Sequence, residues 1–147
     1  MKEVGNIAPK IRPEDIVYIG VRDIEEEEID IMRRLGIRNI TVPEVREKGV
    51  DAIVEIVNDK LKDCDIIYVS FDVDSMCPSL SSYGTGTPVI DGIGPEEAEE
   101  ILVGLAKNPK TICYEIVEVN PCLDEKFNTM AQIALNIIDA LIRVIKK

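Results

Sequence analysis

The sequence contains no histidine and no tryptophan, and its aromatic residues are only two phenylalanines and four tyrosines among 147 residues. Histidine is the usual general base near neutral pH and the commonest protein ligand of transition metals. Its absence excludes both roles for this chain. Any metal binding or acid–base chemistry must therefore use other side chains, or groups that the chain does not supply.

Long apolar runs are also missing, because no window approaches the roughly 20 apolar residues that a membrane span needs. The first ten residues, MKEVGNIAPK, lack the apolar core of a signal peptide. We therefore expect a cytoplasmic protein without a membrane partner. The four cysteines form no CxxC pair, and in the cytosol we expect reduced thiols that pack as small hydrophobes, with a disulfide as the less favoured alternative.

Negative charge dominates the chain, which has a formal net charge of −11 at pH 7. Nucleic acid phosphates would be repelled by this charge, whereas a cationic small molecule would be attracted. The length suits one domain, which we expect to span residues 1–147, and is sufficient for a real hydrophobic core.

Strand and helix patterns alternate along the sequence. Apolar, β-branched runs predict strands at 16–21, 39–42, 66–73 and 111–119, and helical spacing of apolar residues predicts helices at 25–36, 50–61, 94–108 and 124–146. Four strand–helix units in series imply parallel strands, right-handed crossovers and an α/β layer architecture. The strand at 66–73 is almost continuously apolar, which predicts helical cover on both of its faces.

Two aspartates stand where this apolar strand ends. Asp72 and Asp74 are two residues apart, so both side chains can turn to one side while Val73 faces away. Ligands of such sheets bind beyond the carboxyl ends of the strands, where Glu118 also falls after the last predicted strand. These carboxylates could together hold a hard cation.

The DxD pattern alone leaves several interpretations open. It serves magnesium in phosphotransferases of the haloacid-dehalogenase type, metals in sugar transferases, and manganese pairs in other hydrolases. Aspartates at this place can also act only as caps that accept hydrogen bonds from the backbone of the following loop.

Three longer motifs resemble the ureohydrolases, the family of arginase and agmatinase. The stretch SFDVDSMCPSLSSYGTGTPV, residues 70–89, resembles their signature, in which a DxDxxDP core precedes a TGTP loop. Residues 17–37 resemble the arginase segment before that signature, and EIVEVNP at 115–121 resembles the arginase ending. The pair Arg22 and Asp23, and Asn120 where agmatinases tend to have serine, make arginase the nearer resemblance.

The resemblance covers the C-terminal half of that family and implies a partial arginase-like fold, a three-layer α/β/α arrangement with a mainly parallel sheet and about four βα units. It implies hydrolysis of the guanidinium group of L-arginine, a cationic guanidino substrate, to ornithine and urea by a hydroxide that two manganese ions activate. Asp72 and Asp74 would be manganese ligands, Glu118 would hold the guanidinium, and Thr87 would orient Glu118 or the substrate. Carboxylates suit Mn²⁺, and two ions about 3.5–4 Å apart can acidify a shared water.

The chain departs from the family pattern in two respects. Cys77 stands where the family has the third aspartate of DxDxxDP; it is either a soft metal ligand or, as we favour, a packed thiol. The histidine and aspartate ligands of the family's first half, and its proton-shuttling histidine, are missing. The resemblance also implies that a strand of the family's first half lies between strands of this chain. The backbone groups of this chain that would pair with that strand would then lack partners.

Three hypotheses follow from these observations. In the first, the chain is the C-terminal part of an arginase that works only with the N-terminal half, whether that half is a separate, complementing chain or a missing part of the same protein. A homo-oligomer is compatible with the family, which often forms trimers or hexamers, but the sequence leaves the oligomeric state open. In the second, it is a non-catalytic relative of the ureohydrolases that acts as a binding or assembly module. In the third, it is an independent DxD metal enzyme with Asp72 as nucleophile, which the lack of a convincing downstream lysine and acidic motif disfavours.

Overall fold

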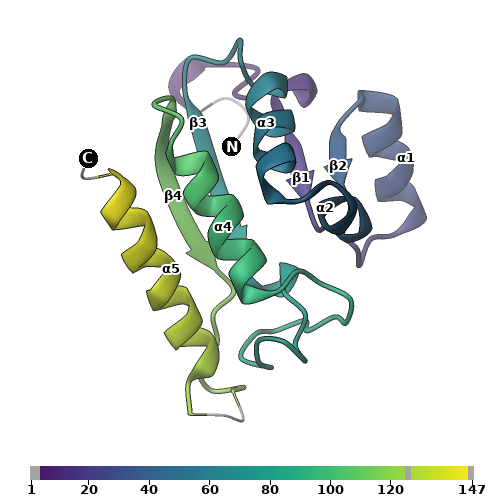
Figure 1. The fold of residues 1–147 in the computed structure, drawn as a ribbon. Helices are drawn as coiled ribbons and strands as arrows, with labels where there is room; N and C mark the ends of the chain where they lie inside the picture. The colour runs from purple at the N-terminus through teal and green to yellow at the C-terminus, as the bar shows by residue number, and fades with distance from the viewer. Residues whose placement is uncertain (1–3, 125–126, 146–147) are drawn as a thin grey trace.

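The computed structural model describes residues 4–124 and 127–145 and shows helices alternating with short parallel strands (Figure 1). The strands are β1 (Val17–Ile19), β2 (Arg38–Ile40), β3 (Ile67–Asp72) and β4 (Thr111–Val117). The helices are α1 (Glu26–Leu35), α2 (Val42–Lys48), α3 (Val50–Lys60), α4 (Pro95–Ala106) and α5 (Thr129–Ile145). The predicted α/β fold class and the order of its four strand–helix units are therefore confirmed.

Helix α2 was not predicted, because Pro43 was interpreted as the end of the second strand. In the structure Thr41 is the N-cap, and its hydroxyl accepts a hydrogen bond from the Glu44 amide at 3.4 Å. Pro43 then occupies the first turn, where its missing N–H costs nothing. The predicted strand at 39–42 was thus placed too far along the chain, and β2 ends at Ile40.

The last helix also begins later than predicted. Helix α5 starts at Thr129, and Asp124, the predicted first residue, instead accepts a hydrogen bond from the Met130 amide at 2.7 Å. Residues 125–126 and 146 of the predicted helix lie outside the described residues.

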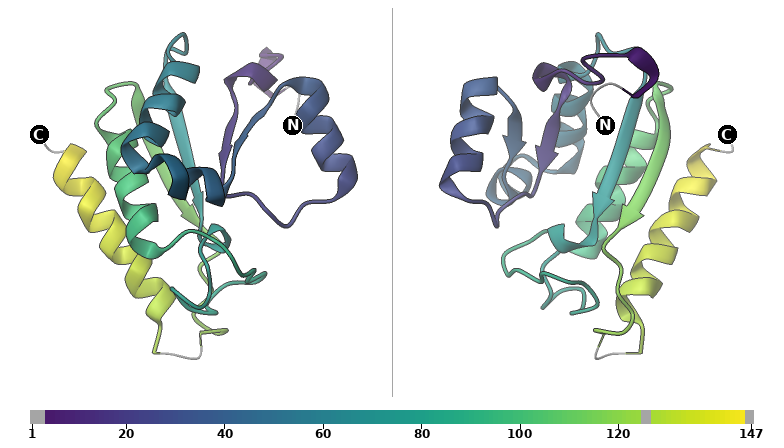
Figure 2. Two further views of the ribbon diagram at one scale, coloured as in Figure 1. Left: turned by 45° about the vertical axis from the view of Figure 1, so that its right-hand side comes forward. Right: turned by 180° about the vertical axis from the view of Figure 1, so that it is seen from behind.

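The strands form two separate parallel pairs within the described part of the chain. β1 pairs with β2, and β3 pairs with β4, with Ile19 opposite Ile40 and Phe71 opposite Ile116. Figure 2 shows the two pairs beside each other, with β1 and β3 as the inner strands. This separation agrees with the expectation that a strand from elsewhere belongs between strands of this chain.

Strand β3 is covered on one face only within the described residues, so the prediction of cover on both faces was wrong for this chain. Ile67 and Phe71 are buried, whereas Tyr68 is 56% exposed and Ser70 is exposed as well. In the view from behind (Figure 2), α4 lies behind β3 and β4, and none of the helices α1 to α5 lies in front of them. This chain therefore covers the face of β3 that carries Ile67 and Phe71 and leaves the face with Tyr68 exposed.

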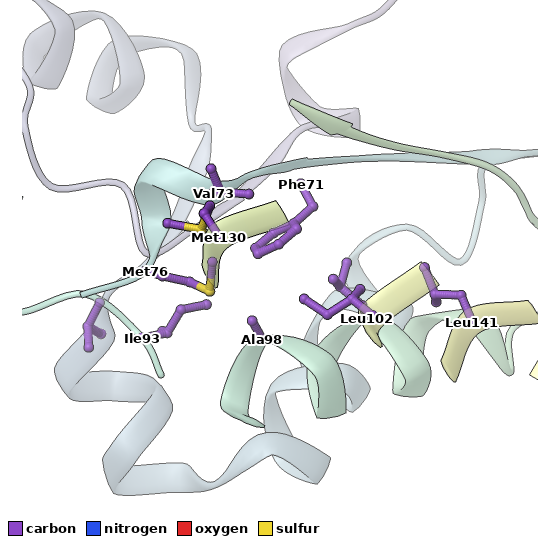
Figure 3. Close-up of a cluster of buried hydrophobic side chains, with 10 residues drawn as sticks. Phe71, Val73, Met76, Ile93, Ala98, Leu102, Met130 and Leu141 are labelled. Atoms are coloured by element: carbon purple, nitrogen blue, oxygen red, sulfur yellow. The ribbon is translucent and has the colours of Figure 1, made fainter. Parts of the chain in front are cut away.

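Two hydrophobic clusters meet along α4. One cluster packs Phe71, Ala98 and Leu102 with Met130 and Ile137 of α5 and continues to the buried residues after β3 (Figure 3). The other cluster joins α4 to α2 and α3; its buried members are Ile40, Val45, Ile53, Val57, Leu61, Ile67, Ile101 and Leu105. Helix α4 thus fixes the carboxyl end of β3 relative to β1. None of the helices within residues 4–124 and 127–145 is both long and apolar enough to traverse a bilayer.

Candidate functional site

A short 3-10 turn, Val73–Ser75, follows β3; the predicted metal ligand Asp72 is its N-cap, and the other, Asp74, lies within it. Val73 is fully buried, so it anchors the turn in the core while its neighbours face outward. The Asp72 Oδ1 atom accepts a hydrogen bond from the Asp74 amide at 2.8 Å, and the Asp72 carbonyl accepts one from the Ser75 hydroxyl at 2.7 Å. Asp72 therefore caps the turn, as the alternative interpretation of this motif expected, and still has a second carboxylate oxygen for a ligand.

Asp74 is half-buried and held by two threonines of the following loop. The Thr85 hydroxyl donates a hydrogen bond to Oδ1 of Asp74, and the Thr87 hydroxyl donates one to Oδ2. Thr85 is buried, whereas Thr87 is exposed. Thr87 was predicted as a site residue and Thr85 was not, although the spacing of the two threonines in GTGTP places both within reach of one carboxylate.

Glu118, the predicted guanidinium ligand, follows β4 with a left-handed backbone conformation, φ +65°. Residues other than glycine rarely adopt this conformation, and such strain clusters at functional sites. Its carboxylate approaches the GTGTP loop: a Cβ atom at Gly86 would lie 3.8 Å from Glu118 Oε2. Because the Thr87 hydroxyl donates to Asp74 in this structure, its role toward Glu118 or a substrate stays a prediction.

A cleft of about 530 Å³ lies between β1 and β3. Asp23, Asp72, Asp74 and Thr87 line its end at the carboxyl ends of the strands. Its floor is apolar and comes from α4 and from the end of α3, with Leu61, Ile101 and Leu105 among the lining side chains. Glu118 does not line this cleft, so the structure brings three of the four predicted site residues together there, while the Glu118 carboxylate lies outside the cleft near Gly86 of the GTGTP loop.

Partial burial changes the pKa of Asp72, the carboxylate at the end of β3. The pKa of Asp72 is raised above its usual value, first because the group is partly removed from water and further because of the nearby negative charge of Asp74, although the hydrogen bond from the Asp74 amide opposes this rise. Ionisation of Asp72 thus costs more in the folded chain than it does for an aspartate in water. A bound cation would relieve that cost.

Cys77 is buried, with 6% of its surface exposed, as the packed-thiol interpretation predicts. Its Sγ atom lies 3.1 Å from the Ser79 hydroxyl oxygen. This hydrogen bond is the main reason that the pKa of Cys77 falls to about 7, against the opposing effect of burial. The thiol is a partner of Ser79 and contributes to loop packing.

The donor chemistry of Asp72 and Asp74 fits Mn²⁺, because hard carboxylate oxygens are its preferred ligands. Their number does not complete a site. Among residues 4–124 and 127–145, no three side chains of histidine, cysteine, aspartate or glutamate gather closely enough to hold a metal ion. A full metal centre at this place would need ligands from another part of the protein or from another chain.

Comparison with known proteins shows a family and a fold. The model of the Arginase family matches residues 5–143. The chain is 37% identical over 142 residues to an arginase of Bacillus caldovelox, covering 96% of this chain and 47% of that protein, and 34% identical over 135 residues to an arginase of Bacillus subtilis, covering 92% and 45%. The chain thus spans about half the length of the curated relatives it matches.

The solved structures agree with the sequence matches. The native arginase structure from Bacillus caldovelox superposes with a TM-score of 0.86, covering 95% of this chain and 46% of that one at 37% identity. A structure described as a hypothetical agmatinase from Burkholderia thailandensis superposes with a TM-score of 0.77 at 28% identity, covering 91% and 39%. The similarity extends over nearly all of this chain and over less than half of these two structures.

Proposed function

The chain belongs to the arginase family, and from this premise we propose that it supplies one part of an arginase active site, which hydrolyses the guanidinium group of L-arginine to ornithine and urea. The observation that carries the proposal is the position of Asp72 and Asp74 at the mouth of the cleft, with both oxygens of Asp74 oriented by threonines. Two manganese ions, when bound, would supply a hydroxide nucleophile at neutral pH.

The residues of this chain have distinct roles in this proposal. Asp72 and Asp74 hold the metal ions through carboxylate oxygens, and Thr87 keeps Asp74 in place. Glu118 binds the substrate guanidinium through charge-assisted hydrogen bonds, which planar guanidinium groups form well with carboxylates. The loop of Gly86 brings Glu118 and Asp74 to the same region of the molecule.

A complementing N-terminal chain is part of the proposal. It would supply the remaining metal ligands and a strand in the cleft between β1 and β3, where the inner edges of the two strand pairs are free of strand partners within the described residues. Parallel strands lie about 4.8 Å apart and pair through their backbones, so a strand is the occupant that satisfies both edges at once.

The test is to measure urea and ornithine release by the purified chain with added Mn²⁺, and then by a complex obtained by co-expression with the part of the Bacillus caldovelox arginase outside the matched segment. We expect no turnover by the isolated chain and measurable turnover by the complex. Asp74→Asn in the complex should abolish turnover, whereas Asp63→Asn, at an exposed position before the amino end of β3 and so at the opposite end of this strand from the site, should leave it unchanged. Appreciable turnover by the isolated chain would contradict the need for a partner.

Cys77 favours a second candidate, a non-catalytic member of the family that acts as a binding or assembly module. Where the family signature has a carboxylate, this chain has a buried thiol bonded to Ser79. Under this alternative the co-expressed complex would form but would neither bind Mn²⁺ nor release urea. Equilibrium dialysis of the complex against Mn²⁺ separates the two candidates.

A further inference from the structure

Main-chain carbonyl groups of three chain segments surround the guanidinium group of Arg22, which follows β1. Its Nη1 atom donates to the Gly20 and Ser75 carbonyls at 3.2 and 3.0 Å. Its Nη2 atom donates to the Asp74 carbonyl at 2.9 Å, to Met76 at 3.2 Å and to Val89. Its Nε atom donates to the Ile90 carbonyl at 3.0 Å. One side chain therefore binds the end of β1, the turn after β3 and the loop beyond Pro88.

The charge of Arg22 is balanced by these carbonyl dipoles. Within residues 4–124 and 127–145, none of the ion pairs involves this guanidinium. Arginine presents five N–H donors in a planar, rigid fork, whereas lysine has one compact ammonium with three rotatable donors. A lysine at this position could reach one segment at a time but could not bind all three together.

The segments that Arg22 joins are those that carry the candidate ligands. Asp74 belongs to the turn after β3, and Thr85 and Thr87 lie on the loop that leads to Val89 and Ile90. Two further backbone bonds tie the same segments: the Cys77 amide donates to the Ile93 carbonyl at 2.9 Å, and the Ile93 amide donates to the Ser75 carbonyl at 3.1 Å. The position of Asp74 relative to its threonines thus depends on how these two segments are held.

We propose that Arg22 is a positioning residue for the candidate metal site: its guanidinium locks the turn of Asp74 against the loop of Thr85 and Thr87, so that the Asp74 carboxylate has one fixed orientation. The use of that orientation in metal binding rests on the proposed function. The locking itself is a property of this chain alone and can be measured without a metal or a partner.

The first experiment is amide hydrogen exchange by NMR on the isolated chain and on Arg22→Lys. Hydrogen bonds to charged groups are stronger than those between neutral groups, so losing several should accelerate local exchange by about tenfold or more. We expect this acceleration at Asp74, Cys77 and Ile93, and unchanged exchange at Ile53 and Leu61, whose amides bond within the region of α3. Equal rates in both proteins at the first three amides would overturn the proposal.

Two controls separate positioning from a general loss of stability. Arg33→Lys, on the exposed surface of α1 where Arg33 pairs with Asp30, should change none of these amides. In Arg22→Ala, methylguanidinium should restore slow exchange at Cys77 and Ile93, whereas the same concentration of methylammonium should not, because only the planar fork can bind both segments. If the alanine variant does not fold, the lysine variant still decides the question.

The second experiment uses the co-expressed complex with the Bacillus caldovelox fragment and measures Mn²⁺ affinity by electron paramagnetic resonance. Arg22→Lys should weaken Mn²⁺ binding by about tenfold while the complex still assembles, a size typical of residues that orient metal ligands. If exchange in the isolated chain is faster in Arg22→Lys but the wild-type complex releases no urea, the role of Arg22 in positioning Asp74 stands and the proposed function is contradicted. Urea release with unchanged exchange in Arg22→Lys would do the reverse.

Discussion

At the scale of single residues, the ionised carboxylate of Asp72 lowers the stability of the folded chain. Its pKa is raised by partial desolvation and by Asp74, so the folded chain prefers the protonated form more than the unfolded chain does. At a pH below the ordinary pKa of aspartate, Asp72 is protonated, and the protonated group favours folding more than the ionised group does. This contribution to stability is lost as the pH rises through the raised pKa of the folded state.

Asp72→Asn should therefore gain stability relative to the wild type as pH rises from about 4 to about 7, since the amide does not ionise. The amide oxygen of asparagine can still accept the hydrogen bond from the Asp74 amide. Urea denaturation at several pH values measures the difference, with Asp63→Asn as a control for the loss of one negative charge. A constant difference between Asp72→Asn and wild type across this range would contradict the assignment.

Accessibility should decide the reactivity of the four thiols more than their acidity does. Cys113 and Cys122 are exposed, Cys64 is half-buried and Cys77 is buried. Although the Ser79 hydrogen bond lowers the pKa of Cys77 to about 7, we expect iodoacetamide to label Cys113 and Cys122 first and Cys77 last. Mass spectrometry of timed samples checks this order. Labelling of Cys77 as fast as Cys113 would show that its loop opens readily.

At the scale of elements, α4 is the joint between the two hydrophobic clusters, and its contact with α3 is close. A Cβ atom at Gly104 would lie 2.6 Å from Cγ2 of Val54. Glycine within a helix usually costs stability relative to alanine, so its presence here is explained by this approach of the two helices.

Gly104→Ala should therefore destabilise the chain by about 1–3 kcal/mol, the usual cost of overpacking a core contact. This cost outweighs the stabilisation that the higher helix propensity of alanine would bring by itself. Thermal unfolding followed by circular dichroism measures the loss. Adding Val54→Ala removes the opposing methyl groups, so the double variant should recover part of the loss relative to the two single changes. Additive effects of the two substitutions would refute the steric explanation.

At the scale of the whole molecule, the chain leaves apolar surface open on two sides. Ile66, just before β3, is 61% exposed, Tyr68 of β3 is 56% exposed and Ile112 of β4 is 64% exposed. Helix α5 has a second, outward stripe at helical spacing, formed by Leu135, Ile138, Ile142 and Ile145, each at least 40% exposed. Apolar surface of this extent marks contact with another protein or a tendency to aggregate.

The isolated chain should accordingly bind the dye 1-anilinonaphthalene-8-sulfonate and self-associate, and both effects should fall in the co-expressed complex. Fluorescence titration and light scattering at equal chain concentration provide the measurements. The variant Ile112→Thr, which keeps a β-branched side chain suited to a strand, should lower dye binding without loss of secondary structure. A complex that binds the dye as strongly as the isolated chain would indicate that the partner does not cover these faces.

The order of strands and helices was readable from the sequence, because apolar periodicity and turn residues act locally. Helix α2 was missed although Thr41 and Pro43 signalled its start, since a proline after an apolar run can end a strand as well as begin a helix. The position of Asp72 and Asp74 where β3 ends also followed from the sequence pattern. Their motif carried the resemblance to the arginase family, which the comparison with known proteins then showed.

The side chains available for chemistry follow from the order of residues alone: carboxylates and hydroxyls at a strand end, no histidine, and a thiol in place of one expected aspartate. How these side chains are held follows from packing, which brings Thr85 and Thr87 to Asp74 and lets Arg22 bind segments more than fifty residues away along the chain. Contacts over such separations depend on where α4 places the end of β3 against β1, and local sequence patterns carry no information about that packing.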